Sequence, residues 1–256
     1  TPKDIQKVLA LAVNVKNFTG NNKGEKFLNV PVSFDIETTS FYRDADGETY
    51  TYDRYIKLGG KQTKMEKCSL MYVWQFGING YCIIGRTWDE FITMLNTISD
   101  VLNLSEKKRI IIYVHNLAYE FQFFRELLQW AKVFSIDLRK PIYGITENGI
   151  EFRCSYLLSG YSLAKLGEQL HKYKCEKLVG DLDYSLLRHS KTPLTQKEIG
   201  YCLNDIKVVM CYIQELIEQY KNITHLPITK TGFVRKYCRS VCFKTTDPET
   251  GKTVQN

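Results

Sequence analysis

Residues 30–40 read VPVSFDIETTS, an apolar run that ends in two acids, Asp35 and Glu37. The run predicts a buried strand, and side chains two residues apart in a strand point to the same face. The two carboxylates are therefore held side by side, where they repel each other unless a proton or a cation lies between them. An isolated pair of this kind is more often just the polar end of a strand. The rest of the chain decides whether it is a site.

The composition predicts a globular protein. The chain has 256 residues, 44% of them hydrophobic, which suits one large domain or two small ones. Its 35 basic and 28 acidic residues leave a net charge of +7, which suits a polyanionic partner without requiring one. The 17 tyrosines fit stacking on unpaired bases as well as ordinary half-buried packing.

The eight cysteines show no CxxC pair and no regular spacing, so we expect reduced thiols in a cytoplasmic protein. Cys238 and Cys242 lack the second pair that a zinc site needs, and a shared helix face explains their spacing better. No apolar run approaches the roughly 20 residues of a membrane span, and the first residues lack the profile of a signal peptide. We therefore expect no membrane association.

Predicted strands and helices alternate along the chain, which indicates an α/β fold with a mixed sheet flanked by helices. Residues 41–67 are polar and longer than most connections, so we interpret them as a functional loop or a mobile insertion. The predicted elements are a strand at 30–37, a hairpin at 68–87 turning at Asn79-Gly80, a helix at 88–102, a strand at 109–116, a helix at 117–131, a hairpin at 141–158 turning at Asn148-Gly149, a helix at 162–173, and a helix from a capping box at Thr195 and Glu198 to about Tyr220.

Two further motifs carry candidate site residues. HNLAYE (115–120) follows a buried strand and opens a helix, so Glu120 would reach the same cleft as Asp35 if the two strands are neighbours. YCLND (201–205) lies within the last helix, where Tyr201 and Asp205 are four residues apart and share a face. Each motif also has a structural interpretation, as a helix cap, a first-turn acid or a solvated helix face.

One explanation accounts for all three motifs in this order: their carboxylates form a metal cage. Four carboxylates from three segments can hold two divalent cations, and oxygen ligands select Mg²⁺ or Mn²⁺ over zinc. Two such ions stabilise both the attacking and the leaving oxygen of a displacement at phosphorus. A tyrosine one helical turn from a metal-binding aspartate can orient the attacking water.

The three motifs resemble those of DEDD-type 3′→5′ proofreading exonucleases that carry Tyr in the third motif and have a ribonuclease H-like fold. The resemblance is closer still to the exonuclease domain of protein-primed family B DNA polymerases of phages, because GDLDYSLLRHSKTPLTQKEIGYCLNDIKVV (180–209) is similar to that family's segment around its third motif. It implies that Asp35, Glu37, Glu120 and Asp205 bind metal and that Tyr201 orients water. It also implies a group of residues that hold the single-stranded 3′ end, namely Thr38, Tyr113, His115, Asn116, Tyr119, Phe123, Ser162, Leu163 and Tyr184.

Two positions depart from that family's pattern. The second motif has Glu120 where Asp is usual, one methylene longer. Val179 stands where the family tends to carry a Lys, and Lys177 is the nearest substitute for a positive charge on the scissile phosphate. Neither change removes the metal cage, so we expect an active nuclease.

The chain shows no polymerase palm motif, and we expect it to be the exonuclease part of a larger polymerase. We divide it into an N-terminal extension (1–29), an exonuclease domain (30–222) and a segment leading toward a palm (223–256). The expected partners are a single-stranded DNA 3′ end and a terminal protein primer, and we expect a monomer. A free-standing exonuclease acting on DNA or RNA and a non-catalytic binding module for nucleic acid or a terminal protein remain as alternatives.

Overall fold

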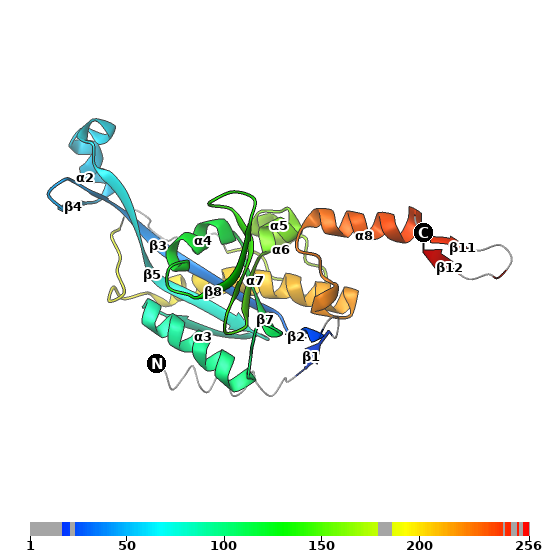
Figure 1. Cartoon of the computed structure of the whole chain (residues 1–256). Helices are drawn as coiled ribbons and strands as arrows, with labels where there is room; N and C mark the ends of the chain where they lie inside the picture. The colour runs from blue at the N-terminus through cyan, green and yellow to red at the C-terminus, as the bar shows by residue number, and fades with distance from the viewer. Residues whose placement is uncertain are drawn as a thin grey trace.

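The computed structural model describes residues 17–20, 24–178, 186–242, 244–246, 250 and 253–255. Its centre is a mixed sheet in the order β6-β5-β3-β7-β10-β9-β8, with β2 beside β7, β1 beside β2 and β4 beside β3 (Figure 1). The strands are β1 (Phe18–Thr19), β2 (Lys26–Leu28), β3 (Val32–Arg43), β4 (Thr49–Tyr50), β5 (Glu66–Ile78), β6 (Tyr81–Gly85), β7 (Lys108–Val114), β8 (Trp130–Ser135), β9 (Pro141–Thr146) and β10 (Ile150–Cys154). β7 pairs in parallel with β2, β3 and β10, and the other pairs in the sheet are antiparallel.

Helices lie on both faces of this sheet, with α3 (Trp88–Leu102) and α4 (Leu117–Phe124) on one side and α7 (Gln196–Tyr220) on the other. The other helices are α2 (Tyr52–Lys57), α5 (Ser155–Ser159), α6 (Leu163–Glu168) and α8 (Lys230–Cys242), and short 3₁₀ turns lie at Gly60–Thr63 and Ile223–His225. A separate hairpin, β11 (Lys244–Thr246) and β12 (Thr253–Gln255), follows α8.

Strand β7 shows why both faces are covered. Ile110, Ile112 and Val114 pack into the core cluster that contains α3 and α4. Ile111 and Tyr113 pack on the opposite side, in the cluster that contains α7. An apolar run of this kind is buried on both faces, as the sequence predicts.

Local sequence signals place several elements where they were predicted. Asn79 and Gly80 both have positive φ, 47° and 85°, as the two-residue turn between β5 and β6 requires. Helix α3 spans Trp88–Leu102 as predicted. Helix α7 begins at Gln196, within the predicted capping box. Thr195 Oγ1 accepts a hydrogen bond from the Glu198 backbone N–H, and Glu198 Oε2 accepts one from the Thr195 backbone N–H.

Two predicted helix boundaries differ from the structure. The helix expected at 117–131 ends at Phe124, because Trp130 starts β8 and packs over Gly144, where a Cβ would lie 2.6 Å from the indole. The helix expected at 162–173 covers only Leu163–Glu168. Strands β1 and β2 lie within residues 1–29, where β2 pairs with β7 and β1 pairs with β2.

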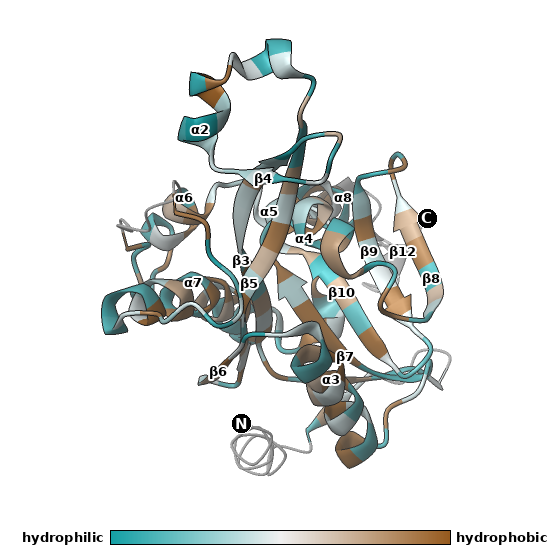
Figure 2. Ribbon diagram, turned by 90° about the vertical axis from the view of Figure 1, so that its left-hand side faces the viewer, coloured by the Kyte–Doolittle hydropathy of each residue, from teal (hydrophilic) through white to brown (hydrophobic). Residues whose placement is uncertain are grey.

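Residues 41–67, which were predicted to be a loop or a mobile insertion, form an arm of paired strands and a helix. Strands β3 and β5 stay paired out to Arg43 and Glu66, and β4 pairs with the outer end of β3. Tyr42 of β3 stacks on Tyr55 of α2, with ring centroids 3.7 Å apart. Residues 41–67, called the arm from here on, therefore form ordered secondary structure that projects from the body of the molecule (Figures 1 and 2).

Among the described residues, no helix is long and apolar enough to cross a membrane.

Candidate functional site

The acids predicted from the first and third motifs meet at one place. β3 and β7 are parallel neighbours, with Ser33 opposite Tyr113, and α7 packs against β3. This arrangement brings Asp35 and Glu37 of β3 to Asp205 of α7, with one carboxylate oxygen of each lying within 4.8 Å of the others. In the described part of the chain, this is the one group of three or more His, Cys, Asp or Glu side chains close enough to share a metal ion.

A β-bulge lies at the centre of this site. Glu37 pairs with Val73 of β5, but Thr38 pairs with Met71, so β5 carries one extra residue between them. Bulges re-aim side chains and increase local twist, and they are common beside active sites. On β5, buried Gln75 donates a hydrogen bond from Nε2 to Glu37 Oε1 over 3.4 Å.

Burial disfavours ionisation of all three acids, and repulsion from neighbouring carboxylates adds to this effect at Asp35 and Glu37. Burial, followed by repulsion from Asp205, raises the pKa of Asp35 to about 7. Burial, followed by repulsion from Asp35, raises the pKa of Glu37 to about 8. Burial also raises the pKa of Asp205 to about 6, although Lys177 opposes this shift. Near neutral pH the cluster must hold protons or a cation.

Glu120 stands next to this group rather than within it. It lies in the first turn of α4, is 5% exposed and interacts through its carboxyl group with that of Asp35. Burial and the charge of Asp35 raise the pKa of Glu120 well above its ordinary value. Within the described residues, Glu120 Oε2 and Asp205 Oδ1 are buried without a hydrogen-bond partner. Buried oxygens without a hydrogen-bond partner are suited to binding a cation.

Lys177 is the positive charge of the site. Its Nζ lies 3.6 Å from Asp205 Oδ2 and 5.8 Å from the ring centroid of Tyr201, which is on α7 one turn before Asp205. Asn204 donates from Nδ2 to the carbonyl of Glu176 over 2.9 Å and so holds the segment that carries Lys177 against α7. Sequence reasoning missed Gln75 and Asn204, because no motif marks contacts that depend on strand register and on a distant segment.

Several residues predicted to contact DNA border the acids. Thr38 and Tyr119 share a hydrogen bond of 2.6 Å between their hydroxyl groups, and Tyr119 is 42% exposed. The half-buried Phe123 ring lies 5.3 Å from that of Tyr119. Asn116 is exposed, and its side chain makes no capping bond to α4, so it is free of the structural role considered above.

The remaining predicted contacts differ in their exposure. Exposed Ser162 caps α6, and half-buried Leu163 packs against the core beneath it. Tyr113 is 1% exposed on the α7 side of β7, so the structure does not bring its side chain to the surface of the site. His115 Nδ1 lies 3.1 Å from Ser155 Oγ, and burial lowers the pKa of His115 to about 4, which keeps the ring neutral at pH 7. Tyr184 and Val179 lie outside the described residues.

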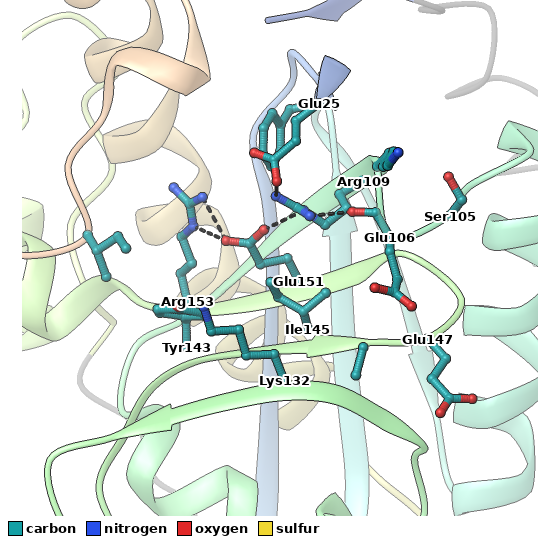
Figure 3. Close-up of a pocket in the computed structure, with 14 residues that line it drawn as sticks. Glu25, Ser105, Glu106, Arg109, Lys132, Tyr143, Ile145, Glu147, Glu151 and Arg153 are labelled. Carbon is teal, nitrogen blue, oxygen red and sulfur yellow. Dashed lines mark hydrogen bonds and ion pairs between the residues drawn. The ribbon is translucent and has the colours of Figure 1, made fainter. Parts of the chain in front are cut away.

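A cavity of about 940 Å³ opens at the other end of β7 and β10, and none of the predicted site residues lines it (Figure 3). Four of its charged side chains, Glu25, Arg109, Glu151 and Arg153, form ion pairs with one another. Arg109 Nη2 lies 3.1 Å from Glu25 Oε1, Arg109 Nε lies 2.9 Å from Glu151 Oε2, and Arg153 Nη2 lies 2.7 Å from Glu151 Oε1. This network ties neighbouring strands together and leaves the acidic cluster as the candidate site.

The architecture is a ribonuclease H-like α/β fold, as predicted. No family model matches the chain, and no curated protein matches it. Solved structures do match. Phi29 DNA polymerase in a ternary complex with primer-template DNA and incoming nucleotides is 14% identical, with a TM-score of 0.58 over 86% of this chain and 36% of that one. Phi29 DNA polymerase complexed with single-stranded DNA is 16% identical, with a TM-score of 0.57 over 85% of this chain and 35% of that one.

These similarities show a shared fold. The chain spans about a third of the length of the solved chains that it matches.

Proposed function

We propose that this chain is the metal-dependent 3′→5′ exonuclease domain of a protein-primed family B DNA polymerase and hydrolyses phosphodiester bonds at single-stranded DNA 3′ ends. The observation that carries the proposal is the meeting of Asp35, Glu37 and Asp205 in one buried group. The fold is shared with Phi29 DNA polymerase, which has been solved in complex with primer-template DNA and with single-stranded DNA, and this similarity supports the choice of substrate.

The donor set fits hard divalent cations. The three side chains that lie close enough together to share an ion are all carboxylates, and oxygen ligands suit Mg²⁺ and Mn²⁺. Asp35, Glu37 and Asp205 would hold these ions, with Glu120 completing the set beside Asp35. Two such ions, when bound, stabilise the charge that develops on the attacking and leaving oxygens of a phosphoryl displacement.

The chain's own residues supply orientation and charge. Tyr201 lies one turn before Asp205, and we assign its hydroxyl to positioning the attacking water. Lys177 lies between Asp205 and the Tyr201 ring, where an ammonium group would attract the negatively charged phosphate. A neutral His115 can donate a hydrogen bond to the DNA strand or accept one from it, and because the ring is uncharged it does not repel the cations.

The aromatic pair beside the acids fits the end of a single strand. The exposed Tyr119 ring and its neighbour Phe123 form a surface on which terminal bases would stack, and such stacking tolerates any base. The Thr38–Tyr119 hydrogen bond fixes this surface directly to β3, one residue after Glu37. Proofreading needs a grip of this kind, because a mispaired end can have any sequence.

The test is incubation with a 5′-labelled single-stranded oligonucleotide and Mg²⁺ or Mn²⁺, with and without chelator. We expect stepwise shortening from the 3′ end that chelator abolishes. Asp35→Ala combined with Glu37→Ala should abolish cleavage, and Glu106→Gln, at an exposed acid near the other end of β7, is the control that should cleave normally. Internal cuts, activity in chelator, or near-native rates in the double variant would refute the assignment.

A further inference from the structure

We propose that the arm is a second nucleic-acid contact, which binds the same single strand on the 5′ side of the end held at the acidic cluster. This inference rests on the proposed function for the location of the 3′ end. It adds a contact surface that the catalytic motifs do not include.

The arm starts at the site itself. Strand β3 carries Asp35 and Glu37, continues through Thr38 and reaches Arg43 at the outer end of its pairing with β5. The six residues from Glu37 to Arg43 extend about 20 Å at about 3.3 Å per residue. A strand whose 3′ end lies at the cluster therefore needs roughly six nucleotides at the 3.4 Å spacing of one DNA strand to reach α2, and fewer if it is extended.

Basic side chains are concentrated on one part of the arm. Residues 54–67 contain one acid, Glu66, and five exposed basic residues, Arg54, Lys57, Lys61, Lys64 and Lys67. In the part of the chain that the structure describes, no carboxylate lies within ion-pair distance of these five. Their charge is therefore available to a polyanion.

The acids of the arm lie mainly in the turn between β3 and β4. Asp44 accepts hydrogen bonds there from the backbone N–H groups of Asp46 (3.0 Å) and Glu48 (2.9 Å) and from the Tyr50 hydroxyl (2.7 Å). These contacts give Asp44 a structural role in closing the turn. The basic residues at 54–67 are therefore separate in sequence from the acids of the turn at 44–48.

Exposed apolar groups lie among the lysines. Tyr52 is 54% exposed and Ile56 is 50% exposed, both on α2. Tyr55 of the same helix is buried against Tyr42, which anchors α2 and leaves the Tyr52 ring outward. Basic residues interleaved with an exposed aromatic ring suit single-stranded DNA, because charge follows the backbone and the ring stacks on a base.

The experiment measures binding of the full chain in chelator, so that no cleavage occurs. Fluorescence anisotropy is followed from about 50 to 200 mM salt with labelled oligothymidylates of about 4 and about 16 nucleotides, the limits of common site sizes. We expect the combined variant Lys57→Ala, Lys61→Ala and Lys64→Ala to reduce the salt slope for the long strand by about 2, at about 0.7 per phosphate contact. For the short strand the parent and the variant should have similar slopes, because that strand does not reach α2.

Tyr52→Ala should weaken binding of the long strand about fivefold or more without changing its salt slope, because it removes a stack and no charge. The matched control removes three exposed lysines from another part of the surface, Lys26→Ala, Lys107→Ala and Lys132→Ala, which among the described residues also have no carboxylate within ion-pair distance. If both triple variants reduce the slope equally, the effect is long-range charge, and the arm contact is refuted.

Deleting the arm tests the proposed contact without relying on the substitution of single side chains. Because Phe41 pairs with Cys68, residues 42–67 can be replaced by an Asn-Gly turn that continues the hairpin. We expect this variant to lose the preference for the long strand. If it keeps that preference, the proposal is wrong and the arm serves a protein partner instead. If the parent chain binds neither strand, the proposed function itself fails.

Discussion

Glu37→Gln should stabilise the metal-free protein at alkaline pH. In the folded chain the pKa of Glu37 is raised to about 8 by burial and by the charges of Asp35 and Asp205, compared with an ordinary value of 4.5. Gln has the same shape and can keep the contact with Gln75, but it carries no charge to bury or repel. The change therefore isolates the electrostatic cost of the empty cluster.

The magnitude follows from the two pKa values. Their difference, 8 − 4.5, corresponds to about 5 kcal/mol at about 1.4 kcal/mol per pH unit. Burying an amide has its own cost, and Asp35 and Asp205 still repel each other in the variant. We therefore expect a net gain of about 2–3 kcal/mol above pH 8, which raises the Tm of a chain of this size by about 5–10 °C.

The sign depends on pH. Between pH 4.5 and 8 the folded state binds a proton that the unfolded chain has released, so the parent loses stability as pH rises through this window. Below about pH 4.5 both states are protonated, and the parent and the variant should be similar. At pH 8, Mg²⁺ or Mn²⁺ should stabilise the parent, by about 2.7 kcal/mol at a hundredfold excess over Kd, and should stabilise the variant less.

The assay is thermal or urea unfolding at pH 5 and pH 8.5, with chelator and then with metal. Glu106→Gln is the control, because that acid is exposed and lies near the other end of β7. The reasoning is refuted if Glu37→Gln is less stable than the parent at pH 8.5, or if the difference is the same at both pH values.

The remaining predictions concern single residues. Tyr201→Phe should slow single-turnover cleavage about 10²-fold with little change in oligonucleotide affinity, whereas Tyr119→Ala should weaken binding by about 1–3 kcal/mol; the opposite pattern would reverse the two roles. Glu120→Asp should lower activity in Mg²⁺ and recover partly in Mn²⁺, and Glu120→Gln should be worse in both; parent-like cleavage by Glu120→Gln would show that Glu120 is no ligand. Gly85→Ala should lower the free energy of unfolding by about 2–3 kcal/mol and the Tm by about 5–10 °C, because the added Cβ would lie 2.1 Å from the buried Trp74 ring. Calorimetry that shows no change in Tm would contradict this.

The elements that sequence analysis placed well are those set by local chemistry. The Asn79-Gly80 turn needs residues that accept positive φ, and the capping box at Thr195 and Glu198 satisfies its own backbone groups. Neither depends on what lies across the sheet. The proximity of the acids of the first and third motifs was also predictable, because the order of the motifs along the chain indicates that they form one site.

The parts that sequence analysis missed depend on partners distant in the chain. Trp130 has neighbours typical of a helix, yet it packs over Gly144 and starts an edge strand. The contact of Asn204 with the Glu176 carbonyl joins two segments with no shared motif. The polar composition of 41–67 suggested a loop, because the Tyr42–Tyr55 stack that gives the arm its own small core cannot be read from residue spacing.

The long hairpin of β3 and β5 also bears on how proteins with this fold can diverge. Side chains in a strand alternate with a period of two, so residues added at the tip of a hairpin do not rotate those at its base. Asp35 and Glu37 therefore keep their direction whether the tip is a short turn or the whole arm. Selection can lengthen, shorten or replace residues 41–67 while the acids stay in place. Helix α2 with its flanking strands is therefore a unit that could be grafted onto another hairpin of this fold, where the contact proposed above would be tested apart from the rest of this chain.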